Sequence, residues 1–175
     1  MEAGLSETPD EELAKSCCPE KVVDAARSWI GTPYRHQASV MGAGADCLGV
    51  VRGVWRELVG PEPEGLPPYA RSWAEDGAGE LMLAAAERWL VPAPGQEIAA
   101  GDVLLFRVSR GTVAKHCGIA TGPRTMVHAY DGHAVAETQV PDVWLHRLAA
   151  RFRFPAVSRS LTVLESVSIA SLNSS

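Results

Sequence analysis

Cys47 is the residue of this 175-residue chain whose position most favours chemistry. It follows Asp46 at the start of a predicted helix, where free backbone N–H groups and the helix dipole stabilise a negative charge. A thiol in such a position tends to have a lowered pKa, and the thiolate is the nucleophilic form of cysteine. Free cysteine is also among the most buried residue types, so position alone leaves a structural cysteine as the alternative.

Two histidines offer the base that a reactive thiol needs. His116 and His128 lie on consecutive predicted strands joined by a turn around Gly122. If the hairpin closes near Gly122, both side chains share one face of the sheet and can interact, whereas a shift of one residue would place them on opposite faces. A thiolate facing a histidine that a second polar residue orients is the general form of a cysteine hydrolase site. Taken alone, each histidine is more often a core or surface group.

Zinc binding is the competing chemistry for this region. His116, Cys117, His128 and His133 are all metal-ligand types and lie within eighteen residues of one another. Neighbouring residues of a strand point to opposite faces, so His116 and Cys117 would not easily join one tetrahedral site. The helical HExxH spacing is absent as well. We therefore expect neither a metal ion nor another cofactor.

The first half of the chain is predicted to be helical. From Cys47 onward, apolar residues recur at the spacing of one buried helix face. Asp46 is a suitable N-cap for this helix, and Gly60-Pro61 ends it. The other elements expected in this half are a helix from Cys18 to about Ile30, a loop over 35–45 and a helix over 78–90.

The second half is predicted to form strands, because its short apolar runs are separated by Gly, Pro and Asp turns. Helices followed by strands indicate an α+β fold. In this fold, N-terminal helices that carry Cys47 pack on an antiparallel β-sheet that carries His116 and His128. The runs cover residues 102–108, 115–121, 125–130 and 134–140, and 151–154 could add a last strand.

Composition excludes several classes of protein. With 46% hydrophobic and 21% charged residues, the chain is neither disordered throughout nor fibrous. The net charge of −5 arises in the first twenty residues, because the remainder carries 15 basic and 15 acidic side chains. A neutral body without a Lys/Arg stripe argues against nucleic acid as a partner. No apolar run is long enough for membrane insertion, and the N-terminus lacks the pattern of a signal peptide.

Five short motifs resemble, in order, the landmarks of the NlpC/P60 family, whose members are papain-like cysteine peptidases that cut bacterial cell-wall peptides. The resemblance spans about residues 20–155, and the ordered set is specific although each piece alone is weak. It places a catalytic domain at 19–156, between an acidic leader at 1–18 and a serine-rich tail at 157–175 that is either disordered or a docking segment. The motifs are Gly31-Thr32-Pro33-Tyr34, Asp46-Cys47-Leu48-Gly49, Gly101-Asp102-Val103-Leu104, His116-Cys117-Gly118-Ile119 and Val127-His128-Ala129.

The resemblance implies a role for each matching residue. Cys47 would be the nucleophile, His116 the general base, and His128 the polar residue that orients the His116 ring. Tyr34 matches a tyrosine expected to help bind substrate or the oxyanion, for which the backbone N–H of Cys47 is a donor on physical grounds too. Asp46 matches an acidic position that pairs with a substrate amine, and a helix cap is an equally supported role.

The implied function is hydrolysis of a peptidoglycan stem-peptide amide, most specifically the bond between γ-D-glutamate and diaminopimelate. This chain has Leu48 where the family commonly has serine, which removes a hydroxyl near the substrate. The chain looks most like the phage-tail branch, including peptidases of gene-transfer-agent particles. It would then be synthesised in the bacterial cytoplasm without a signal peptide and incorporated into a phage-tail-like particle beside tail-tip or baseplate proteins.

Two alternatives to a peptidase remain open from the sequence. The first is a structural tail or baseplate protein with a vestigial site, in which the leader and the tail serve for docking and Cys47 belongs to the core. The second is an acyltransferase on the same fold, which hydrophobic lipid-binding helices would support. The sequence does not show such helices.

Overall fold

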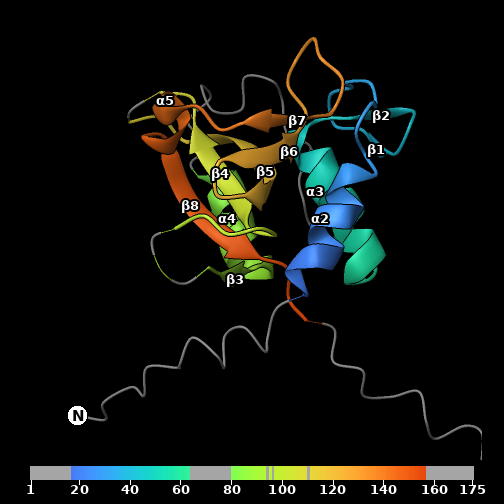
Figure 1. Cartoon of the computed structure of the whole chain (residues 1–175), viewed down its shortest axis with the longest axis horizontal. Coiled ribbons are helices and arrows are strands. Elements are labelled where there is room, and N and C mark those ends of the chain that lie inside the picture. Colours follow the sequence, from blue (N-terminus) through green and yellow to red (C-terminus); the bar gives the residue numbers. More distant parts are fainter. Residues whose placement is uncertain (1–16, 64–79, 94, 96, 110, 157–175) are drawn as a thin grey trace, which may run out of the picture.

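Helices, one large antiparallel sheet and one small antiparallel sheet form the structure, a computed structural model that describes residues 17–63, 80–93, 95, 97–109 and 111–156 (Figure 1). The architecture is the α+β arrangement that the sequence predicts. Apart from Cys17 and Cys18, the predicted leader lies outside the described residues, as does the serine-rich tail. Within the part of the chain that is described, no helix has the length and apolarity to cross a membrane.

The helices largely follow the predicted pattern. Helix α2 covers Pro19–Arg27 and ends before the predicted Ile30, where the backbone turns toward Gly31, whose φ is +87°. Helix α3 covers Cys47–Leu58 and begins at the predicted residue. The other helices among the described residues are α4 at Leu81–Trp89 and the short α5 at Asp142–Leu145, which the sequence did not predict.

The main sheet contains the predicted meander. Its strand order is β3-β8-β4-β5-β6-β7, so β4 to β7 are neighbours in chain order while β8 returns to pair with β4 on the other side. A second, two-stranded sheet of β1 and β2 occupies the segment expected to be a loop, where two-residue strands leave no alternation to detect. The strands are β1 at Ser39–Val40, β2 at Gly44–Ala45, β3 at Val91–Pro92, β4 at Val103–Arg107, β5 at Ala114–Gly122, β6 at Thr125–His128, β7 at Ala136–Gln139 and β8 at Leu148–Arg153.

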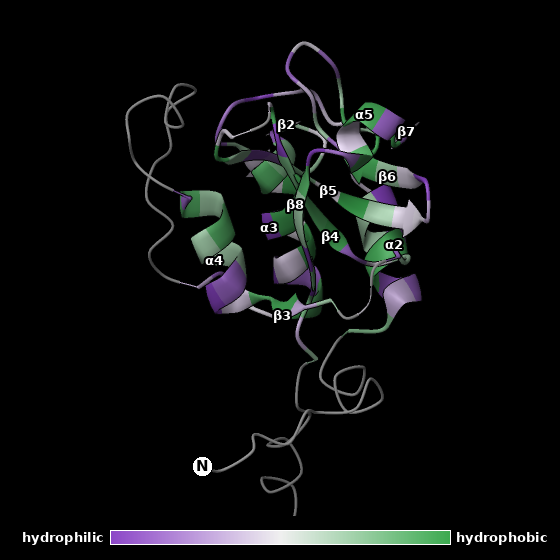
Figure 2. Ribbon diagram, turned by 90° about the vertical axis from the view of Figure 1, so that its left-hand side faces the viewer, coloured by the Kyte–Doolittle hydropathy of each residue, from purple (hydrophilic) through white to green (hydrophobic). Residues whose placement is uncertain are grey.

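Apolar side chains cover both faces of the sheet centre. Alternate residues of β4 belong to different clusters, because successive strand residues point to opposite faces. Val103 and Leu105 pack toward α2 and α3, while Leu104 and Phe106 pack on the other face near α5. Apolar residues accordingly follow β4 and β5 through the middle of the molecule (Figure 2). The central strands are therefore anchored from both sides.

Close packing between α2 and α3 fixes the direction of α3. A Cβ added at Gly53 would lie 1.8 Å from the indole ring of Trp29, so only glycine allows this approach. Trp29 is itself buried at the end of α2. The helix that begins at Cys47 is thereby held against α2 on one side and the sheet on the other.

Asp102, in the predicted Gly101-Asp102-Val103-Leu104 motif, links β4 to the strand that completes the sheet. Its carboxylate is fully buried and pairs with Arg151 at 3.2 Å and Arg153 at 3.1 Å, both on β8. It also accepts the backbone N–H of Ala99 at 2.9 Å. A buried carboxylate is stable only with such partners, so this motif residue has a structural role.

Candidate functional site

The start of α3, where Cys47 lies, is held by the buried carboxylate of Asp46. One oxygen accepts the backbone N–H of Gly49 at 2.8 Å, as an N-cap does, and the other accepts that of Gln37 at 2.6 Å. The ring of His36 lies 3.6 Å from the same carboxylate. Asp46 is 2% exposed and is therefore the helix cap that the sequence allowed. Its other predicted role, pairing with a substrate amine, stays a prediction.

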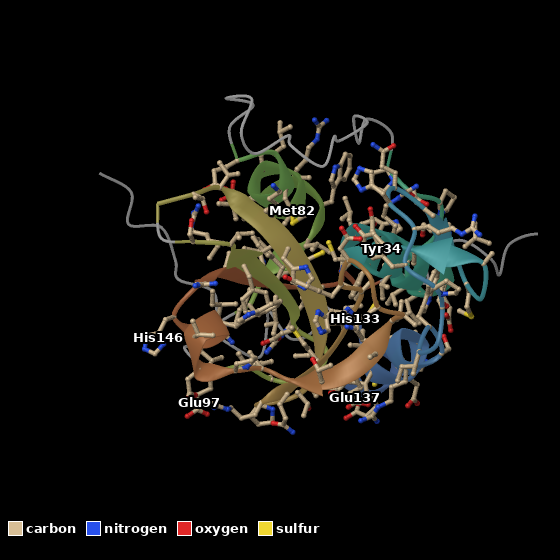
Figure 3. All side chains as sticks on the ribbon, turned by 90° about the horizontal axis from the view of Figure 1, so that it is seen from above. Tyr34, Met82, Glu97, His133, Glu137 and His146 are labelled. Carbon is tan, nitrogen blue, oxygen red and sulfur yellow. The ribbon has the colours of Figure 1, made fainter. Side chains whose placement is uncertain are left out.

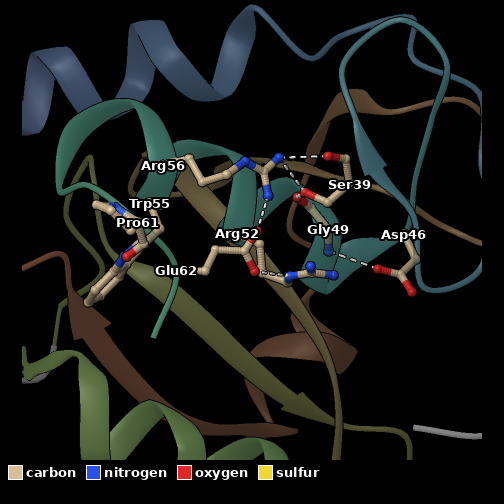
Figure 4. Close-up of polar contacts among 8 residues, drawn as sticks. All are labelled: Ser39, Asp46, Gly49, Arg52, Trp55, Arg56, Pro61 and Glu62. Carbon is tan, nitrogen blue, oxygen red and sulfur yellow. Dashed lines mark hydrogen bonds and ion pairs between the residues drawn. The ribbon is translucent and has the colours of Figure 1, made fainter. Parts of the chain in front are cut away.

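The first turn of α3 also packs directly on the backbone of the preceding loop. A Cβ at Gly49 would lie 1.9 Å from the carbonyl oxygen of Ala38, so glycine is required there. The Ser39 hydroxyl donates to the Gly49 carbonyl at 2.6 Å, and Arg56 donates to the Ser39 carbonyl at 2.6 Å. Figure 4 shows the hydrogen bonds of Ser39 together with the ion pair between Arg56 and Glu62. Ser39 thus connects the first turn of α3, which carries Cys47, to Arg56 in its last turn.

His116 and His128 meet on one face of the sheet. The pairing of Ile119 with Val127 continues to place Gly118 opposite His128, so His116 is the diagonal neighbour of His128. The two rings are nearly perpendicular, at 85°, and His116 Nε2 lies 2.9 Å from His128 Nδ1. Of the two registers that the sequence left open, the structure has the one in which both histidines share a face.

Gly118 makes room for this pair. A Cβ at Gly118 would lie 3.2 Å from the Cβ of His128 and 2.9 Å from the sulfur of Met126. Both of those side chains pack over the glycine from β6. The glycine of the predicted His116-Cys117-Gly118-Ile119 motif therefore serves the positioning of His128.

His128 is buried, and its second ring nitrogen makes a hydrogen bond to a third strand, β7. Its Nε2 lies 2.9 Å from the hydroxyl oxygen of Thr138 on β7. Burial, and secondarily the nearby His116, lower the pKa of His128 from 6.5 to about 4. His128 is therefore neutral at pH 7.

Aromatic rings surround the histidine pair. Trp144 of α5 stands edge-on to His116 at 4.9 Å and to His128 at 5.8 Å between ring centroids. The half-exposed ring of Tyr130 lies 5.9 Å from that of His116, and the buried ring of Phe106 lies 6.3 Å from that of His116. Nothing in the sequence pattern indicated Trp144, because α5 is too short for a periodic signal, and the strand pattern that covers Phe106 and Tyr130 does not show that they lie next to His116.

The Cys47 side chain interacts with those of Cys117 and His116. The Cys117 thiol, then His116, hold the pKa of Cys47 well below its usual range, against the opposing effect of burial. Cys117 is buried in the apolar cluster on the helix side of the sheet, and its pKa is raised by the adjacent Cys47 and by burial. The structure thus brings Cys47, His116 and His128 together, with Cys117 as an additional neighbour that spacing alone did not indicate.

The remaining predicted residues lie around this cluster. Tyr34 is half-buried beside the start of α3, and its backbone bridges to Ala45, two residues before Cys47 (Figure 3). Its role in binding substrate or oxyanion stays a prediction. His133 is exposed in the loop between β6 and β7, with its ring 6.4 Å from Tyr130. Among the described residues, no three His, Cys, Asp or Glu side chains form a group suited to a metal ion.

A cysteine at a helix start, facing a histidine pair on an antiparallel sheet, places the structure in the class of papain-like α+β domains. The family model described as "NlpC/P60 family" matches residues 31–153. The chain therefore belongs to the NlpC/P60 family. Every motif predicted from the sequence lies within the matched range.

Known proteins agree with this assignment. The chain is 30% identical over 135 residues to the gamma-DL-glutamyl hydrolase of Bacillus subtilis strain 168. That match covers 76% of this chain but only 29% of the relative, so the chain spans under a third of the relative's length.

Solved structures share the fold at lower identity. An NlpC/P60 family protein from Bacillus cereus ATCC 10987 has a TM-score of 0.55 at 15% identity, covering 79% of this chain and 41% of that one. The NlpC/p60 domain of the peptidoglycan hydrolase SagA has a TM-score of 0.51 at 21% identity, covering 79% of this chain and all of that domain.

Replacing Cys117 with valine should raise the pKa of Cys47, because the variant stays apolar but loses the thiol that donates to the thiolate. We expect a shift of about one pH unit, the size of one charge-assisted hydrogen bond. The measurement is the pH dependence of iodoacetamide alkylation at Cys47, followed by peptide mass spectrometry. Cys117→Ser retains a donor and should keep the midpoint low, as should Cys17→Ala. An unchanged midpoint in Cys117→Val would contradict the assignment.

The lowered pKa of His128 predicts a loss of stability in acid. Between about pH 6.5 and pH 4 the unfolded chain binds a proton that the folded chain excludes, so the free energy of unfolding decreases as pH falls. The shift corresponds to at most about 3 kcal/mol. Urea unfolding at pH 7 and pH 4.5 should show a smaller pH dependence for His128→Asn than for the wild type. His133→Asn, at an exposed histidine, is the control, and equal pH dependence in all three proteins would refute the prediction.

Proposed function

We propose that this chain is a cysteine endopeptidase that hydrolyses an amide bond of the peptidoglycan stem peptide, between γ-D-glutamate and diaminopimelate. The observation that carries the proposal is the row of Cys47, His116 and His128, with Cys47 at a helix start and the histidine nitrogens 2.9 Å apart. The gamma-DL-glutamyl hydrolase of B. subtilis supports this choice of substrate class by its name.

The chemistry follows from the placement of the charges. The thiolate of Cys47 attacks the amide carbonyl, a C–S bond forms, and the carbonyl electrons move to oxygen. The backbone N–H of Cys47, at the positive end of α3, stabilises this oxyanion. Tyr34, whose backbone pairs with Ala45 just before the helix, is assigned to assist. Protonated His116 then donates its proton to the leaving amine as the C–N bond breaks.

Deacylation reverses the roles of the same groups. A water molecule attacks the thioester carbon while neutral His116 takes its proton, and the C–S bond then breaks to restore the thiolate. His128 holds the His116 ring through both steps by its 2.9 Å hydrogen bond. No metal or organic cofactor takes part in this scheme.

Leu48 and Asp46, the two neighbours of Cys47 in the chain, are the residues that we expect to select the stem peptide. Leu48 follows Cys47 and is half-buried, so it offers an apolar contact where a serine would offer a hydroxyl. We therefore infer that the residue on one side of the scissile bond makes an apolar contact here. Asp46 already accepts two backbone N–H groups and has the His36 ring 3.6 Å away, so a substrate amine would have to share the carboxylate with these groups.

Purified muropeptides incubated with the protein should be cleaved between glutamate and diaminopimelate, and mass spectrometry of the products identifies the bond. Cys47→Ala should abolish cleavage, and His116→Ala should reduce it by at least about a thousandfold, as expected for a member of a catalytic triad. Cys18→Ala, at an exposed cysteine, is the matched control and should retain full activity. Cleavage at another bond would keep the mechanism and revise the specificity. Intact products with every protein, including on whole sacculi, would favour a structural protein with an inactive site.

We further propose that the protein is made in the bacterial cytoplasm and carried in a phage-tail-like particle, held by tail-tip or baseplate proteins. The resemblance to the phage-tail branch supports this. So does the position of the domain ends, since the Cys17 N–H donates to the Phe154 carbonyl at 2.8 Å and the Phe154 ring lies 6.5 Å from that of Trp55. Trp55 lies about 12 Å along α3 from Cys47, so attachment there would leave the nucleophile accessible.

Mass spectrometry of purified particles should detect this chain together with tail proteins. A chain that is found only in the cytosolic fraction, and never with particles, would contradict this part of the proposal without affecting the peptidase assignment.

A further inference from the structure

We propose that Thr138 is a positioning residue, which selects the tautomer of His128 that the catalytic pair requires. The inference rests on the proposed function of Cys47 and His116 and adds a residue to it. Neither the sequence motifs nor the similarity to known proteins points to Thr138.

The three polar side chains form a diagonal row across three strands. His128 lies opposite Gly118 on β5 and opposite Ala136 on β7. His116 lies two residues before Gly118 on β5, and Thr138 lies two residues after Ala136 on β7. Because β5 and β7 run in the same direction, the two side chains lie on opposite sides of His128 along one diagonal. The hydrogen bonds of the row are both 2.9 Å long and use the two different nitrogens of His128.

The proton positions in this row depend on one another. Protonated His116 carries N–H groups on both ring nitrogens, so its Nε2–H must donate to an unprotonated Nδ1 of His128. His128 is neutral because burial lowers its pKa to about 4, and its single proton must then sit on Nε2. That N–H donates to the Thr138 hydroxyl oxygen. The opposite tautomer would present an N–H to the N–H of His116.

Thr138 is suited to accept this hydrogen bond. Its side chain is exposed on β7, so its own O–H can donate to water while the oxygen receives the His128 N–H. Trp144 stands edge-on to both histidine rings and limits the access of water to their shared hydrogen bond. The hydroxyl of Thr138 therefore lies where the row leaves the protein interior and meets solvent.

The direct test is the tautomer of His128, read from ¹⁵N-histidine NMR at pH 7 in the full chain. The wild type should show the Nε2–H form. Thr138→Val, which keeps the shape but removes the acceptor, should show a mixture of tautomers or the Nδ1–H form. Thr138→Ser should restore the Nε2–H form, and Thr125→Val, a second threonine of the sheet that bonds Thr121 rather than His128, should leave it unchanged.

The second readout is reactivity. Thr138→Val should slow alkylation of Cys47 at pH 6.5 and lower kcat on muropeptides by roughly three- to tenfold, the range for one hydrogen bond at a site that water reaches. KM should stay unchanged, because Thr138 does not touch the substrate. Thr138→Ser and Thr125→Val should both behave as the wild type.

The outcomes separate the two proposals. A wild-type tautomer and wild-type alkylation rate in Thr138→Val would overturn the role of Thr138, whether or not the enzyme cleaves muropeptides. A changed tautomer that Thr138→Ser restores would support that role even if no muropeptide were cleaved, in which case only the proposed function would fail. A changed tautomer that Thr138→Ser does not restore would indicate a packing effect and overturn the inference.

Discussion

The candidate site depends on the register between β5 and β6. Because side chains alternate along a strand, a slip of one residue would move His128 to the opposite face from His116 and separate the pair. Gly122 pairs with Thr125 where the hairpin closes, and a one-residue shift between Ala120 and Gly122 then sets the pairing of Ile119 with Val127. The buried Val127 and Met126, on the two faces of β6, support this register. Packing of the strand on both sides thus determines which polar groups can meet.

A second constraint brings the nucleophile to this pair. Helix α3 approaches its neighbours at two glycines, Gly49 on the Ala38 carbonyl and Gly53 on the Trp29 ring, and either contact would be lost with a larger residue. The buried Asp46 also connects the loop to the helix, because it accepts a backbone N–H group from each. The glycines are therefore part of the site, although they perform no chemistry.

The sequence predicted those parts of the structure that follow a periodic pattern. Helix α3 was predicted with its starting residue and its cap, and the strands β4 to β7 with their order. The shared face of His116 and His128 was one of two registers that the sequence left open, because the shift between Ala120 and Gly122 has no periodic signal. It did not predict Thr138 or Trp144, because these contacts depend on a diagonal displacement across strands and on a four-residue helix. The contact between Cys47 and Cys117 was missed for a related reason, since it depends on how closely a helix end approaches the sheet.

The positions of Cys47, His116 and His128 determine which of these side chains can carry a charge. A thiolate at Cys47 is favoured by the helix end, by Cys117 and by His116, but a charged His116 also needs an acceptor on its far nitrogen. His128 can be that acceptor only while it stays neutral, and its burial beneath Trp144 provides this. A carboxylate in place of His128 would hold the imidazolium more strongly and make His116 a weaker proton donor to the leaving amine. A buried neutral histidine supports the charge pair less strongly, so that the proton remains available for transfer.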